Sequence, residues 1–146
     1  MAVAEVHLIT GIALIAANLT AGVWGSLDWL YRRPSVGFWY TLRVAQASVV
    51  LQVILGGVLV FLGREASENL HYLYGLQPLF VSFLAELIRA GAAQQELGEL
   101  DFQGMSEERQ QEVALAIVRR ETGIMAVACL VIVGLALRAA GTSTAF

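Results

Sequence analysis

Four apolar segments, each long enough to cross a lipid bilayer, make up most of this chain. They cover residues 6–27, 36–62, 70–88 and 123–140, and a helix needs about 20 apolar residues to cross the hydrocarbon core. Of the 146 residues, 58% are hydrophobic and only 14% are charged, a composition too apolar for a soluble domain of this size. The sequence therefore predicts an all-α integral membrane four-helix bundle in contact with the lipid bilayer.

The connections between these segments predict a single domain over residues 1–146. We expect four helices, at about residues 6–27, 36–62, 70–88 and 107–140. The long polar stretch at residues 90–120 lies before the last span, and Ser106, followed by Glu107 and Glu108, is typical of a helix N-cap with acids at the positive end of the helix dipole. The fourth helix should therefore begin in the cytoplasm, ahead of its membrane span.

The arginines predict the orientation, because the chain contains no lysine. Those that flank the first and third connections are Arg32, Arg33, Arg43, Arg89, Arg109, Arg119 and Arg120, whereas the opposite side has only Arg64 and Arg138. The positive-inside rule then makes the first and third connections cytoplasmic. We expect a multi-pass protein of the cell membrane with both termini outside. The first span lacks a basic region before it and is too long for a signal-peptide core, so it should remain in the mature protein.

The only two histidines begin the same five-residue pattern, H-x-x-x-G. They stand in His7-Leu8-Ile9-Thr10-Gly11 and in His71-Tyr72-Leu73-Tyr74-Gly75. In the expected topology both lie about one turn in from the outer surface, and an imidazole inside a membrane needs a partner that lipid does not offer. We therefore expect His7 and His71 to face each other at one depth.

Small and polar residues share the helix faces of the two histidines and occur again on the second helix. They are Gly11, Gln52, Gly56, Gly57 and Gly75. One interpretation is ordinary membrane packing, in which small residues let helices approach closely and amides bond across the seam. The other is that the glycines leave room for a flat macrocycle held between the two imidazoles.

Haem b with two histidine ligands is the cofactor that best fits this pattern, with His7 and His71 as the metal ligands. Neutral imidazole is a good axial ligand, and an apolar macrocycle suits a bundle interior. Zinc or copper would need more ligands, and the single cysteine, Cys129, is expected to be a small core or lipid-facing residue. Arg64 and Arg138, at the outer helix ends, would pair with haem propionates or anchor the interface. The alternative for the histidines is an interfacial position wetted by headgroup water.

Three successive helices of this chain resemble one half of a haem A synthase. The matching segments are Glu5-Val6-His7, Leu42-Arg43, Leu51-Gln52-Val53-Ile54-Leu55-Gly56-Gly57 and Leu70-His71. That family has a histidine near the outer end of one helix, a Q-x-x-L-G-G-like stretch in the next, and a histidine at the outer start of the third. The resemblance covers about residues 5–79 and implies one four-helix bundle with a haem between His7 and His71.

The chain departs from that family around its first histidine and in its length. In the synthases an acid normally lies three places before this histidine and an arginine directly follows it, whereas here Glu5 lies two places before His7 and Leu8 follows. The synthases carry two bundles in one chain. A haem-modifying activity of this single bundle would therefore require a dimer.

Three functions remain open, and the catalytic residues of any enzyme among them are not assigned. The first is a membrane haem b protein that passes electrons to or from a quinone or a redox partner protein. The second is a haem-free accessory subunit that scaffolds a larger membrane complex, and the third is a half-size haem-modifying enzyme. Gly22 and Gly25 would permit close helix contact in a homodimer. The sequence contains no nucleotide-binding loop and no nucleic-acid patch.

Overall fold

A computed structural model describes residues 3–66, 68–98 and 101–142, and over these residues the chain contains helices and turns without strands. The elements are α1 (Val3–Tyr31), α2 (Val36–Phe61), α3 (Asn69–Gly98), the short 3-10 helix η1 (Phe102–Gly104) and α4 (Glu107–Gly141). Each of the four α-helices is long and apolar enough to cross a membrane. The prediction of an all-α four-helix bundle is confirmed.

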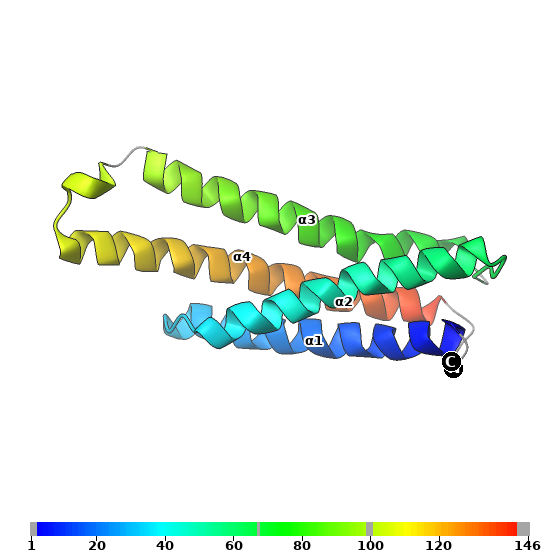
Figure 1. Ribbon diagram of the computed structural model, residues 1–146. Helices are drawn as coiled ribbons and strands as arrows, with labels where there is room; N and C mark the ends of the chain where they lie inside the picture. Colours follow the sequence, from blue (N-terminus) through cyan, green and yellow to red (C-terminus); the bar gives the residue numbers. More distant parts are fainter. Residues whose placement is uncertain (1–2, 67, 99–100, 143–146) are drawn as a thin grey trace.

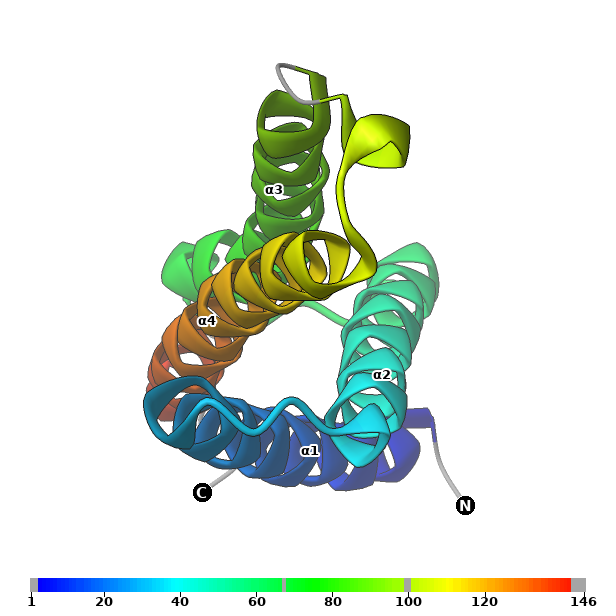
Figure 2. The ribbon, with the colours of Figure 1, turned by 90° about the vertical axis from the view of Figure 1, so that its left-hand side faces the viewer.

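The four helices pack against one another to different extents. α1 packs along α2 and α4, and α3 packs along α4, whereas α2 and α3 touch only sparsely (Figures 1 and 2). At one end of the bundle α3 and α4 project beyond α1 and α2 and are joined through η1 (Figure 1). The seam between α2 and α3 is therefore the least closely packed of the four.

The closest packing lies in the half of the bundle near the α1–α2 connection. Phe38, Met125 and Cys129 are buried there, so Cys129 is a core residue. A Cβ atom at Gly22 would lie 2.7 Å from the Leu130 side chain, and one at Gly25 would collide with Phe38. Both glycines thus serve close packing within one chain, so they offer no surface for a second copy.

α3 is longer than the sequence predicts, ending at Gly98 rather than near residue 88. The added turns are rich in alanine and glutamine, which favour helix. Ala92 is buried, and Glu96 forms an ion pair with Arg120 of α4 at 2.9 Å. α4 begins at Glu107, where the Ser106 hydroxyl oxygen accepts a hydrogen bond from the Arg109 N–H. These contacts belong to the part of the α3–α4 pair that projects beyond α1 and α2 (Figure 1).

Candidate functional site

A cavity of about 580 Å³ lies at the end of the bundle where α1 begins and α2 ends. All four helices line it, mainly with apolar side chains, and its volume is within the range typical of cofactor sites. It brings together all the residues that the sequence predicts for cofactor binding except Arg138. They are His7, Gly11, Gln52, Gly56, Gly57, Arg64, His71 and Gly75.

His71 lies in the first turn of α3, and its ring is oriented by the backbone of α4. Its Nδ1 atom is 2.9 Å from the carbonyl oxygen of Ala139. A carbonyl oxygen only accepts, so Nδ1 carries the proton and donates it, which leaves a lone pair on Nε2. A backbone carbonyl bonded to the other ring nitrogen is the usual support of a metal-binding histidine.

His7 lies in α1 and is bound by Gln52 of α2. The Gln52 amide nitrogen is 3.0 Å from the His7 carbonyl oxygen and 3.3 Å from His7 Nε2. The Thr10 hydroxyl donates to the amide oxygen at 2.5 Å. An amide nitrogen only donates, so the Nε2 atom of His7 is the acceptor and also carries a lone pair. The proton is then on Nδ1, the buried side-chain polar atom without a partner among the described residues.

The two imidazole rings lie close together in an edge-to-face arrangement. Their ring centroids are 6.3 Å apart and their planes are inclined at 63°. With metal–nitrogen bonds of about 2.0 Å and about 1.1 Å from each nitrogen to its ring centre, two imidazoles on one ion have centres about 6.2 Å apart. The centroid distance is therefore close to the value for two imidazoles on opposite sides of one metal ion.

The glycines around the pair keep the space beside the rings clear. A Cβ atom at Gly56 would lie 3.4 Å from His7 Cε1, and one at Gly11 would lie 3.0 Å from the Gln52 amide nitrogen. At Gly57 and Gly75 an added Cβ would meet no atom within 4 Å. Gly11 thus permits close approach of α1 and α2, whereas a Cβ at Gly56 would make ordinary van der Waals contact with His7. Gly57 and Gly75 leave open volume on the two sides of the α2–α3 seam.

The two outer arginines have different positions. Arg64, in the connection after α2, lines the cavity. Arg138 instead lies with its guanidinium 5.7 Å from the centre of the Tyr74 ring, and it is not among the described residues that line the cavity. Tyr72 was not predicted as a site residue, yet its hydroxyl accepts from the Ala66 N–H at 2.8 Å and thereby orders the connection beside Arg64.

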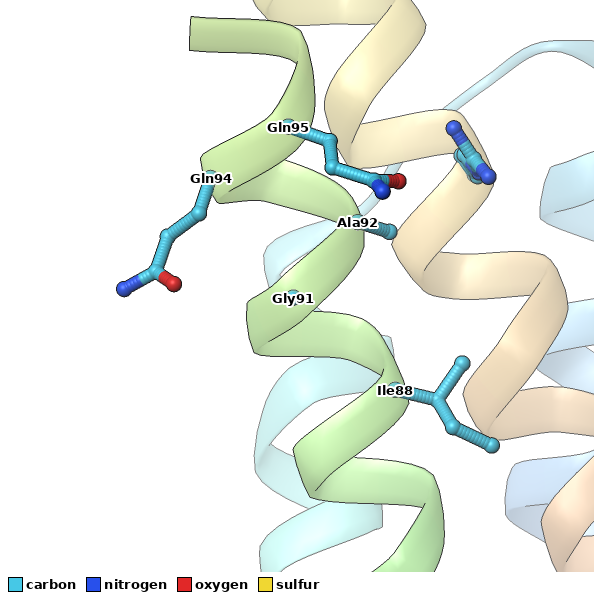
Figure 3. A pocket seen from close by; sticks show the side chains of 6 residues that line it. Ile88, Gly91, Ala92, Gln94 and Gln95 are labelled. Carbon is cyan, nitrogen blue, oxygen red and sulfur yellow. The ribbon is translucent and has the colours of Figure 1, made fainter. Parts of the chain in front are cut away.

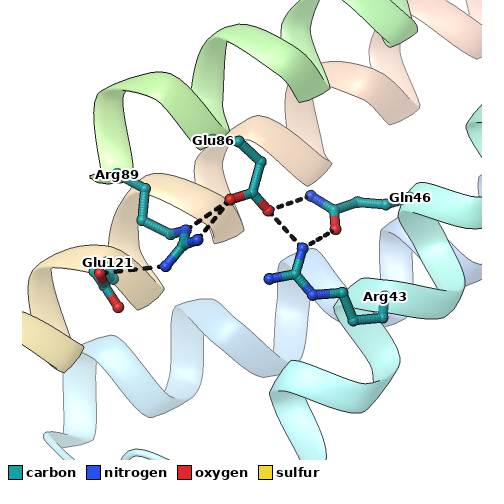
Figure 4. A network of polar contacts seen from close by, with 5 residues as sticks. All are labelled: Arg43, Gln46, Glu86, Arg89 and Glu121. Atoms are coloured by element: carbon teal, nitrogen blue, oxygen red, sulfur yellow. Dashed lines mark hydrogen bonds and ion pairs between the residues drawn. The ribbon is translucent and has the colours of Figure 1, made fainter. Parts of the chain in front are cut away.

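A second polar cluster joins α2, α3 and α4 about 22 Å along α3 from His71, at 1.5 Å per residue. Glu86 accepts from Arg43 at 2.6 Å, from Gln46 at 2.8 Å and from Arg89 at 2.8 Å, and Arg89 also pairs with Glu121 at 3.3 Å (Figure 4). The sequence indicates the Glu86–Arg89 pair through its spacing of three residues. The other members depend on how neighbouring helices are rotated, which the sequence does not specify.

A broad depression lies on the outside of α3 and α4, near the end remote from the histidines (Figure 3). Ile88, Gly91, Gln95 and Arg120 are among its lining residues. Arg120 is already paired with Glu96, so its charge is balanced within the chain. None of the predicted site residues lines this depression.

No protein-family model, curated protein or solved structure matches this chain. Within the described part of the chain, no three His, Cys, Asp or Glu side chains gather where they could hold a metal ion. A group that takes two axial protein ligands and brings the remaining ligands itself is what the His7–His71 pair can accommodate.

Proposed function

We propose that this chain is a membrane haem b protein in which His7 and His71 are the two axial ligands. The observation that carries the proposal is the pairing of two imidazoles, each with its Nε2 lone pair free of a proton, at a centroid distance of 6.3 Å. When bound, the haem would supply one-electron redox chemistry.

Different residues of the cavity would hold different parts of the haem. The Ala139 carbonyl keeps the proton of His71 on Nδ1 and fixes the orientation of its ring. Gly57 and Gly75 leave volume for a flat macrocycle, and the mainly apolar lining suits its apolar rim. Arg64 would bind the propionate carboxylates through charge-assisted hydrogen bonds.

The proposed setting is the cell membrane, with both termini and the histidine end of the bundle at the outer face. The bias of the arginines toward the first and third connections supports this orientation. A quinone in the bilayer or a redox protein would exchange electrons with the site. A homodimer, or docking within a larger membrane complex, is proposed from the resemblance to a two-bundle family alone.

An optical spectrum of the protein purified from cells supplied with ample haem tests the proposal. We expect a Soret band and, after reduction, sharp α and β bands typical of a low-spin iron with two nitrogen ligands. The double variant His7→Ala/His71→Ala, which should retain the fold, should lack these bands. A folded wild-type protein that binds no haem would contradict the proposal and would favour the haem-free scaffold.

A further inference from the structure

Gln52 is held in a fixed orientation beside His7. Its amide oxygen accepts from the Thr10 hydroxyl at 2.5 Å, and its amide nitrogen donates to the His7 carbonyl oxygen at 3.0 Å. Rotating the Gln52 amide by half a turn would place its oxygen against the His7 carbonyl oxygen, and two acceptors would then repel each other. A Cβ atom at Gly11 would lie 3.0 Å from the amide nitrogen, so the space around this side chain is also filled.

This orientation decides which nitrogen of His7 carries the proton. The second amide hydrogen of Gln52 points to His7 Nε2, 3.3 Å away, and keeps that atom unprotonated. The proton must then occupy Nδ1, which has no hydrogen-bond partner among the described residues. A buried Nδ1 without a partner costs free energy whether it carries the proton or the lone pair, so its surroundings do not select a tautomer. The donation from Gln52 to Nε2 therefore decides the position of the proton.

We infer that Gln52 is a positioning residue that keeps the Nε2 lone pair of His7 available for the haem iron, an inference that rests on the proposed function. The two histidines reach the same tautomer by opposite means. At His71 the Ala139 carbonyl accepts the proton of Nδ1, whereas at His7 an amide donates to Nε2. In the ligand-free protein the Gln52 amide also caps this lone pair. The amide is held 3.3 Å from Nε2 by its bonds to Thr10 and to the His7 carbonyl, and an iron ligand bond is only about 2.0 Å long, so the His7 ring would have to turn away from the amide for Nε2 to meet iron.

Three side chains of similar length at position 52 distinguish a hydrogen-bonding role of Gln52 from a role in packing alone. Glutamine donates to Nε2, methionine in Gln52→Met neither donates nor strongly accepts, and the carboxylate in Gln52→Glu only accepts. Nitrogen-15 NMR of histidine-labelled, haem-free protein in nanodiscs reports the protonated nitrogen of each ring, and a His71→Ala sample assigns the two signals. We expect His7 to be unprotonated at Nε2 in the wild type, mixed in Gln52→Met and protonated at Nε2 in Gln52→Glu. His71 should stay unchanged throughout.

Haem titration of the same variants measures the consequence for ligation. We expect the affinity to fall in the order wild type, Gln52→Met, Gln52→Glu, with the last about 10- to 100-fold weaker than the wild type, as for other residues that orient a metal ligand. Ser48→Ala is the matched control on α2, because the Ser48 hydroxyl bonds to the Ala45 carbonyl of its own helix. It should change neither the tautomers nor the affinity.

Two results would overturn the inference. One is a wild-type His7 with its proton on Nε2. The other is a set of Gln52 variants in which the tautomer of His7 and the haem affinity both stay at the wild-type values. If the tautomers follow the expected order but even the wild type binds no haem, the role of Gln52 in setting the His7 tautomer is supported and the proposed function is overturned.

Discussion

At the scale of single residues, the two histidines could be predicted as a pair from the sequence. The groups that hold them in place through hydrogen bonds could not. The shared pattern and equal expected depth of the histidines follow from the sequence, and the structure brings the rings to 6.3 Å. The Ala139 carbonyl and the Thr10 hydroxyl could not be predicted as their supports. A backbone carbonyl has no sequence signature, and the partner of a threonine hydroxyl depends on the rotation of the facing helix.

His7 and His71 have different hydrogen-bond partners, so we expect their removal to cause different losses of haem. In the proposed haem protein, the bond from His71 to the Ala139 carbonyl would be retained and would make this imidazole the stronger ligand, whereas His7 would have to give up its contact with Gln52. We expect His7→Ala to retain a five-coordinate haem on His71 and His71→Ala to retain less haem. Pyridine haemochrome assays and spectra of both variants measure this, and equal, unchanged low-spin spectra would contradict it.

At the scale of elements, the sequence predicts the apolar helices well and the helix pairing poorly. Length and composition alone identify four spans. α2 and α3 touch only sparsely, and Gly57 and Gly75 on these helices have open space beside them, whereas in the sequence the same glycines also fit ordinary close packing. The extension of α3 to Gly98 was missed because its alanines, glutamines and charged residues lack the apolar signal used to predict the spans.

The glycines of the cavity predict how haem occupancy responds to added volume. Gly56→Leu would press on His7, and Gly75→Leu would fill open space of the cavity. We expect both variants to bind less haem, since overpacking costs about 1–3 kcal/mol. Gly134→Leu is the matched control, because Gly134 lies in α4 with nothing within 4 Å of an added Cβ and does not line the cavity. Full occupancy in both test variants would assign these glycines to helix packing instead.

The polar cluster around Glu86 predicts a local contribution to stability. Glu86 connects α3 to Arg43 of α2 where these helices otherwise touch little. We expect Glu86→Gln to lower stability by about 1–2 kcal/mol, because it leaves the charges of Arg43 and Arg89 without their shared carboxylate. Thermal unfolding in detergent measures the effect. Glu96→Gln, which removes the more exposed pair with Arg120, should shift the midpoint less, and an equal shift would contradict the special role of Glu86.

At the scale of the whole molecule, the orientation predicts which ends of the bundle an impermeant reagent can reach. The natural cysteine is buried, with 2% of its surface exposed, so a cysteine introduced at an exposed position reports alone. We expect Glu68→Cys to react with an impermeant maleimide added to intact cells. Glu108→Cys, on the projecting part of α4, should react only after permeabilisation. The reverse pattern would place the termini and the histidine cavity on the inner side.

Pulsed electron paramagnetic resonance of the ferric, haem-loaded protein tests whether His7 and His71 both bind the haem iron. The chain has two histidines, so labelling histidine with nitrogen-15 marks only His7 and His71. We expect a low-spin iron with strong hyperfine coupling to two nitrogen-15 nuclei. A single coupled nucleus remains in His7→Ala. A haem-loaded wild-type protein whose iron shows no coupling to nitrogen-15 would contradict ligation by this pair.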